Sequence, residues 1–267
     1  MKIRQFTFTL LFLFSFISVA CAKDTPLDRA HSHNDYNHRR PLFDALDHRF
    51  CSIEADIHLT NGQLLVAHDL KDVQPDRSLE KLYLKPLLEQ VRKNGGRVYR
   101  DGPPVTLLID VKSDAPTTYA ALREVLKNYS EMLTKFDHEK IETNAVTVVV
   151  TGNRAREIIA KEKTLFVALD GRAEDLELEK PSNLIPLISE DWKKYFQWKG
   201  VGPIPVEEKN RLREIVEKTH QQGRRLRFWG TPDKPEFWRE LCDANVDLIG
   251  TDDLDGLDKF LRSVSEK

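Results

Sequence analysis

The stretch Cys51-Ser-Ile-Glu-Ala-Asp-Ile-His58, followed closely by Gly62-Gln-Leu-Leu-Val-Ala-His68-Asp69, decides the predicted fold. It predicts a strand, a tight turn and a second extended segment. Alternate side chains of a strand share a face, so Glu54, Asp56 and His58 point to one side and the apolar residues between them to the other. The apolar face suits packing beneath helices. The polar face is then expected to point into a barrel interior or the mouth of a site.

Two carboxylates on that polar face predict a metal site. Glu54 and Asp56 are two residues apart, and their charges repel each other unless a cation lies between them. Carboxylate oxygens are hard ligands of the kind that Mg²⁺ and Ca²⁺ prefer. The alternative is an exposed sheet face with two solvated acids, and burial decides between the two interpretations.

The size and composition of the chain favour one large globular domain. It has 267 residues, 40% of them hydrophobic, and a formal charge of −2. This length suits a single α/β barrel. Because there is no basic excess, nucleic acid is not an expected partner. Two cysteines, Cys51 and Cys242, are expected to be buried small hydrophobic residues rather than a disulfide, and no pattern indicates an oligomeric state.

The N-terminus predicts export. A positively charged start precedes an apolar run, and Ala20-Cys21-Ala22 fits the small-x-small cleavage pattern of a signal peptide over residues 1–22. The run is too short, and its far flank too polar, for a transmembrane anchor. We therefore expect a secreted or periplasmic barrel domain over residues 23–267. Lipidation of Cys21 is the less favoured alternative, because Ser18 stands where lipoproteins usually carry an aliphatic residue.

Strand-like and helix-like segments alternate along the chain after this point. Near-continuous apolar runs, such as residues 105–112, are typical of strands buried on both faces of a parallel sheet. Eight strands, nearly all followed by helices, predict an α/β fold. They favour a single (β/α)₈ TIM barrel rather than a doubly wound sheet. The expected strands are a short one ending at His31 and then residues 51–58, 105–112, 146–150, 165–169, 184–188, 225–230 and 247–252.

Barrel active sites lie at the C-terminal ends of the strands, which selects a short set of polar residues. One chemistry that they could perform is attack on a metal-bound phosphodiester, with one histidine as base and another as acid. The other uses His31 and His33 as paired metal ligands, as in amidohydrolase barrels. That chemistry needs further histidines at later strand ends, and residues 146–188 contain none. The selected residues are His31, His33, Glu54, Asp56, His68, Asp110, Lys112, Trp229, Thr251 and Asp252.

The order His31, Glu54-x-Asp56, Gly62 and His68-Asp69 resembles the glycerophosphodiester phosphodiesterase and phosphatidylinositol phospholipase C superfamily. The fuller pattern over most of the chain is similar to a branch that includes the fungal altered-inheritance-of-mitochondria proteins. The resemblance implies a PLC-like phosphodiesterase TIM barrel. It also implies His31 and His68 as catalytic residues, Glu54, Asp56 and Asp110 as ligands of a divalent metal (Mg²⁺ or Ca²⁺), and Lys112 and Trp229 as substrate-binding residues.

The chain departs from this pattern at one position. Ser32 stands where glycerophosphodiesterases carry an arginine that contacts phosphate. His33 and Asn34 are the candidates to take over part of that substrate contact. His33 is also the alternative to His31 as the catalytic base.

The sequence thus predicts an exported, metal-dependent phosphoric diester hydrolase. The expected substrate is a glycerophosphodiester, a phospholipid headgroup or a related phosphodiester. A non-catalytic exported barrel that binds a phosphorylated ligand is the alternative. The presence together of His31, Glu54, Asp56, His68 and Asp110 disfavours that alternative, because a binding protein does not need all five.

Overall fold

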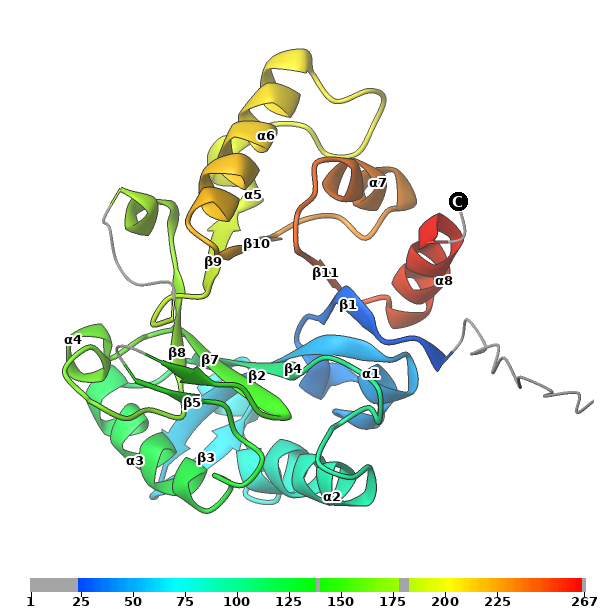
Figure 1. The fold of residues 1–267 in the computed structure, drawn as a ribbon. Helices are drawn as coiled ribbons and strands as arrows, with labels where there is room; N and C mark the ends of the chain where they lie inside the picture. The colour runs from blue at the N-terminus through cyan, green and yellow to red at the C-terminus, as the bar shows by residue number, and fades with distance from the viewer. Residues whose placement is uncertain (1–23, 138–139, 178–182, 266–267) are drawn as a thin grey trace, which may run out of the picture.

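Eight parallel strands form a closed barrel in the computed structural model, which describes residues 24–137, 140–177 and 183–265 (Figure 1). The barrel closes because the first strand pairs with both the second and the last. The predicted (β/α)₈ barrel is therefore confirmed, while the expected signal peptide lies outside the described residues. The barrel strands are β1 (Leu27–Ser32), β2 (Phe50–Thr60), β4 (Val105–Val111), β7 (Val146–Gly152), β8 (Ala168–Gly171), β9 (Leu187–Asp191), β10 (Arg225–Trp229) and β11 (Leu248–Thr251).

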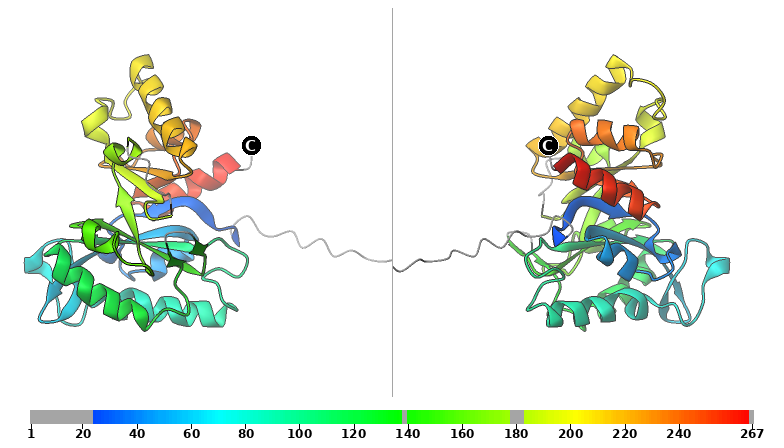
Figure 2. Two further views of the ribbon diagram at one scale, coloured as in Figure 1. Left: turned by 60° about the vertical axis from the view of Figure 1, so that its left-hand side comes forward. Right: turned by 90° about the vertical axis from the view of Figure 1, so that its right-hand side faces the viewer.

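Helices surround the barrel on the outside (Figures 1 and 2). Local sequence explains where several of them begin: the side chain of Asp114 accepts a hydrogen bond from the Thr117 amide, and Pro235 opens another helix. No helix in the described part of the chain is long and apolar enough to cross a membrane. The helices are α1 (Phe43–Asp47), α2 (Lys85–Lys93), α3 (Ala115–Lys127), α4 (Arg156–Ile159), α5 (Trp192–Tyr195), α6 (Val206–Gln221), α7 (Pro235–Asp243) and α8 (Leu254–Ser265).

The predicted hairpin after the second strand is present. Strand β3 (Gln63–Val66) pairs antiparallel with β2, and Asn61 and Gly62 form the turn with φ of 50° and 76°. Positive φ at both positions is what a two-residue hairpin turn requires. This hairpin carries the loop with His68 to the mouth of the barrel.

Two barrel strands begin three residues later than the sequence predicts. Leu165 pairs instead with Phe136 of the short strand β5 (Lys135–Phe136), which forms a two-stranded ribbon with β6 (Ile141–Glu142). Pro186 has no amide hydrogen and precedes β9 rather than lying in it. Apolar runs predict both segments, and these runs begin in the connections that precede β8 and β9.

The polar and apolar faces of β2 divide as predicted. Ile53, Ala55 and Ile57 are fully buried in the core between the barrel and its helices.

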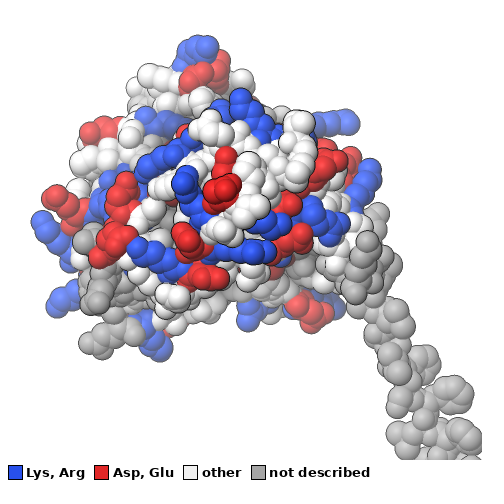
Figure 3. All heavy atoms as spheres, turned by 90° about the horizontal axis from the view of Figure 1, so that it is seen from above, with Lys and Arg blue, Asp and Glu red and all other residues white. Residues whose placement is uncertain are grey.

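Cys51 is buried and Cys242 partly buried, and both are free thiols. On the face in Figure 3, basic and acidic side chains are interspersed, in keeping with the near-neutral sequence.

Candidate active site

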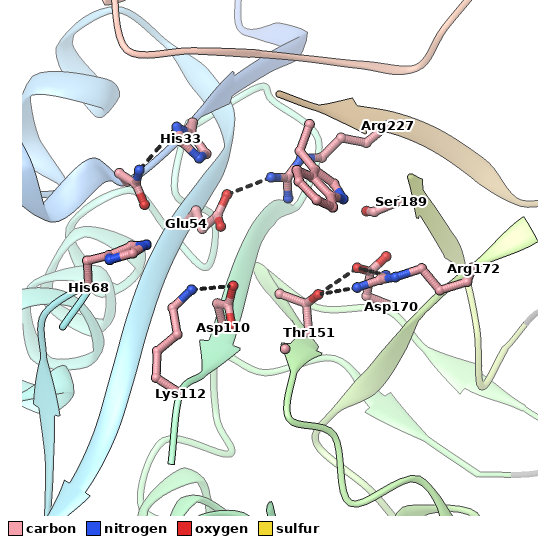
Figure 4. A pocket seen from close by; sticks show the side chains of 13 residues that line it. His33, Glu54, His68, Asp110, Lys112, Thr151, Asp170, Arg172, Ser189 and Arg227 are labelled. Carbon is pink, nitrogen blue, oxygen red and sulfur yellow. Dashed lines mark hydrogen bonds and ion pairs between the residues drawn. The ribbon is translucent and has the colours of Figure 1, made fainter. Parts of the chain in front are cut away.

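The C-terminal ends of the strands surround a pocket of about 330 Å³ (Figure 4). Strand register brings its acids together: Asp56 of β2 is level with Asp110 of β4, which is level with Thr151 of β7. The pocket is lined by His33, Asn34, Glu54, His68, Asp110, Lys112, Thr151, Gly152, Asp170, Arg172, Ser189, Arg227 and Trp229.

Two carboxylates that line this pocket, Glu54 and Asp110, form the candidate metal centre together with the fully buried Asp56. Glu54, Asp56 and Asp110 each offer an oxygen within 4.8 Å of the others. Lys112 Nζ lies 3.0 Å from Asp56 Oδ2 and 2.9 Å from Asp110 Oδ2. The Oδ1 atoms of the two aspartates are buried and have no hydrogen-bond partner among the described residues. An all-oxygen set with two open, buried oxygens fits a hard divalent cation.

Burial and the neighbouring negative charges raise the pKa of two of the three acids, Asp56 and Asp110. Burial, followed by the charges of Glu54 and Asp110, raises the pKa of Asp56 to about 6, although Lys112 opposes the shift. Burial also raises the pKa of Asp110. A cation bound among these carboxylates would favour their ionised forms.

His31 is fully buried and holds Glu54 in place. Its Nε2 lies 2.8 Å from Glu54 Oε2, and its Nδ1 lies 2.7 Å from Ser52 Oγ. Burial and then the charge of Arg227 lower the pKa of His31 to about 4, against the opposing effect of Glu54. The neutral ring therefore donates from Nε2 to Glu54 and accepts at Nδ1 from Ser52. Both of its nitrogens are engaged.

The described residues of the pocket wall include His33 but not His31. His33 Nδ1 lies 2.9 Å from Asp252 Oδ1 and 3.3 Å from the side-chain nitrogen of Asn34, Nδ2. Burial lowers the pKa of His33, but the hydrogen bond with Asp252 and the charge of Glu54 outweigh this, so the net shift is upward. Only Nδ1 of His33 is engaged in these contacts, which leaves Nε2 for the pocket.

His68 lies at the entrance, on the loop that follows β3. Its side chain is 61% exposed, and its Nδ1 lies 3.2 Å from Asp69 Oδ1. The ring of His58, a residue for which the sequence suggests no role, is buried and donates from Nε2 to the His68 carbonyl over 3.1 Å. His58 thus supports the loop that presents His68.

The sequence does not predict several of the polar residues that line the pocket. Arg227 is buried, and its Nη2 lies 2.9 Å from Glu54 Oε2. The period-two pattern of its strand could have found it, because Arg227 and Trp229 share a face. Asp170 was missed because the predicted strand ended at residue 169. The others are Thr151, Arg172 and Ser189.

Comparison with known proteins identifies the family of this chain. Residues 21–168 match the family model of the AIM6-like phosphodiesterase domain. The chain is 31% identical to Altered inheritance of mitochondria protein 6 of Eremothecium gossypii, over 89% of this chain and 71% of the relative. The chain belongs to the AIM6-like phosphodiesterase family. An AIM6 homolog from Arthroderma benhamiae is 28% identical over 84% of this chain and 81% of the homolog.

Solved structures share the barrel with this AIM6-like chain. A glycerophosphodiester phosphodiesterase from Parabacteroides distasonis has a TM-score of 0.53 at 16% identity, covering 90% of this chain and 98% of its own. A calcium-dependent phosphoinositol-specific phospholipase C from Pseudomonas sp. has a TM-score of 0.57 at 13% identity, with coverage of 86% and 91%. At these identities the likeness shows the shared fold, and the site has to be argued from its own residues.

Proposed function

We propose that this protein is an exported, metal-dependent phosphoric diester hydrolase. One observation carries the proposal: Glu54 and Asp110 line the same pocket as two histidines, and with the buried Asp56 they form a cluster of three carboxylates with two open oxygens. Family membership and the shared barrel support phosphodiester chemistry. The location outside the cytoplasm is supported by the sequence of the N-terminus alone.

The residues of the candidate metal centre fit a divalent cation. Glu54, Asp56 and Asp110 would hold Mg²⁺ or Ca²⁺, which when bound supplies a Lewis acid for the phosphoryl oxygens. Lys112 and Arg227 add positive charge beside the carboxylates. These two groups attract the phosphodiester anion and take over the part that an arginine at Ser32 would play.

We assign the base to His33 rather than to His31. Both nitrogens of His31 are engaged by Ser52 and Glu54, and it serves to position the Glu54 carboxylate. His33 donates from Nδ1 to Asp252, so its Nε2 can take the proton of the nucleophile, either water or a neighbouring substrate hydroxyl. The exposed His68 is the candidate acid for the leaving oxygen.

A panel of phosphodiesters assayed with Mg²⁺, Ca²⁺ or EDTA tests the proposal. We expect turnover that EDTA abolishes and one of the two ions restores. Asp110→Asn should lose activity, while Asp243→Asn, at the end of α7 and away from the pocket, should keep it. Full turnover in excess EDTA would contradict metal dependence. Binding of phosphorylated ligands without turnover under any condition would favour the non-catalytic alternative.

A further inference from the structure

Asp35 is a fully buried carboxyl group that the proposed proton transfers do not use. Its Oδ1 accepts a hydrogen bond from Ser32 Oγ over 2.8 Å, and its Oδ2 accepts from the Leu42 amide over 2.5 Å and from the Tyr83 hydroxyl over 2.9 Å. These three donors are neutral. Burial raises the pKa of Asp35, and the three hydrogen bonds oppose that shift without cancelling it. A carboxyl group held in this way is costly to bury, so its presence needs an explanation.

Irregular backbone brings two of these donors to Asp35. Leu42 has φ of 68° and ψ of −54°, near the values of the rare and strained γ-turn with positive φ. Tyr83 lies in a π-helical turn, Glu80–Leu84, which leads directly into α2. Such turns are rare and often occur at functional sites. Irregular backbone that converges on one buried group indicates a positional role for that group.

Asp35 belongs to a turn, residues 33–37, that carries side chains of the candidate active site. His33 and Asn34 line the pocket (Figure 4). The Tyr36 hydroxyl lies 2.7 Å from Asn34 Oδ1 and 2.9 Å from Asp56 Oδ2. Asn34 has φ of 46° and ψ of 42°, so a single residue in the left-handed conformation separates His33 from Asp35. A shift of the turn would therefore displace the proposed base.

Ser32 acquires a role through the same contacts. It is fully buried, and the described residues that line the pocket do not include it. Its hydroxyl donates to Asp35, which lies three positions later in the chain. Ser32 therefore anchors the turn from β1, while Tyr83 anchors it from the segment before α2 and Leu42 from the start of α1.

We propose that Asp35 is a positioning residue, which together with Ser32 and Tyr83 holds His33 at the pocket and in contact with Asp252. Asp35 does not line the pocket, so it acts through His33 and not on the substrate. The assignment rests on the proposed function, in which His33 is the base. A merely structural Asp35 would stabilise the fold and leave the state of His33 unchanged.

Tyr83→Phe and Tyr99→Phe are matched variants that test the assignment. Both hydroxyls are buried, but Tyr99 donates to the Phe50 carbonyl over 2.7 Å, at the start of β2 and so at the end of the barrel away from the pocket. Each variant loses one buried hydrogen bond, so both should lower Tm. Only Tyr83→Phe should lower kcat, by about tenfold and with little change in KM, because it misplaces the base.

The probe for these measurements is bis(p-nitrophenyl) phosphate, whose leaving group needs no acid. Asp35→Asn places an amide group against the donors and should lower kcat by about 10²-fold. Should that variant fail to fold, Tyr83→Phe and Ser32→Ala decide the question, since each removes one donor only. Equal kcat in Tyr83→Phe and Tyr99→Phe would overturn the assignment and leave the phosphodiesterase function in place.

Histidine-ring NMR spectra, recorded without substrate or added metal, test the assignment independently of turnover. Burial lowers the pKa of His33, while Asp252 and Glu54 raise it more. A loosened turn loses both effects, so the pKa of His33 should fall towards 6.5 in Tyr83→Phe and stay unchanged in Tyr99→Phe. If the wild-type protein does not hydrolyse the probe, this fall alone supports the positioning role. An unchanged pKa in Tyr83→Phe would then overturn it.

Discussion

Arg227 and Glu54 form a buried ion pair that joins β10 to β2, with 2.9 Å between Nη2 and Oε2 and both side chains 5% exposed. The same Glu54 oxygen also accepts from His31. Two donors on one oxygen fix the orientation of the carboxylate. Oε1 is then the oxygen available to a ligand.

Breaking this pair from either side should be costly. Glu54→Gln leaves the Arg227 charge buried without its partner and should lower the free energy of unfolding by about 3 kcal/mol or more. Arg227→Met leaves the Glu54 charge buried without Arg227 and should have a similar cost. The double variant should be less destabilised than the sum of the two, as measured by urea unfolding of the metal-free protein. Additive losses would show that the pair is not coupled.

Gly152 leaves room for the metal centre. It has φ of +68°, and a Cβ there would overlap Asp110 Oδ1 and lie 2.6 Å from the Val111 carbonyl. Gly223 has a similar φ of +65°, but no described atom lies within 4 Å of the position that a Cβ would take there. Alanine at either site should cost about 1–2 kcal/mol of backbone strain. Only Gly152→Ala should also weaken Mg²⁺ or Ca²⁺ binding, measured by calorimetry; equal affinities in the two variants would contradict this role.

The acidic limb of the pH profile should report on His33. Burial lowers its pKa, but Asp252 and Glu54 raise it more, so the net value lies above 6.5 despite the Arg227 charge. A base works deprotonated, so kcat/KM should fall as pH drops through this raised pKa. Asp252→Asn, at saturating metal, should move the limb to lower pH. His33→Ala should remove the acidic limb. If the limb persists in this variant, His31 becomes the candidate base.

The same shift has a consequence for stability. Because the folded protein binds the His33 proton more tightly than the unfolded chain, the stabilisation is fully present below pH 6.5. It is lost as pH rises through the folded pKa. In Asp252→Asn this part of the pH dependence should shrink.

His68 should matter most where the leaving group needs a proton. His68→Ala should slow release of an alkoxide by about 10² to 10⁴ and have far less effect with p-nitrophenolate, which departs unprotonated. His33→Ala should be slow with both, since the nucleophile still needs its base. Comparable losses for His68→Ala on the two leaving groups would exclude His68 as the acid.

Export is tested at the N-terminus. The pattern Ala20-Cys21-Ala22 predicts cleavage that leaves Lys23 as the first residue of the native product. N-terminal sequencing or an intact-mass measurement identifies the first residue of the native product. A lipidated Cys21 would instead indicate a membrane-anchored product, and a retained Met1 would refute processing.

Local patterns were enough to predict the barrel and the proximity of the three carboxylates of the candidate metal centre. The period of a strand places Glu54 and Asp56 on one face, and parallel strand ends converge, so Asp110 could be expected beside them. Partners across the barrel could not be predicted in this way. The contact of Arg227 with Glu54 depends on packing between strands 173 residues apart in sequence.

The choice between His31 and His33 also lay beyond local patterns. The two residues lie two positions apart at the end of one strand, and both look equally polar in the sequence. Their difference is one of depth: His31 is fully buried against Ser52, whereas His33 extends past the end of β1 to reach Asp252. Depth in a barrel is set by the register of neighbouring strands, which the sequence of one strand does not contain.

Closure of the barrel by β1 and β11 ties the order of folding to the assembly of the site. His33 and Asp252 are 219 residues apart, so their contact cannot form until nearly the whole described chain has been synthesised. Contacts of such long range form slowly, because the entropy of closing the loop must be overcome first. A chain whose last barrel strand has not yet been made therefore lacks the contact between His33 and Asp252. The seam between β1 and β11 and the orientation of the proposed base, His33, thus depend on the same last strand of the barrel.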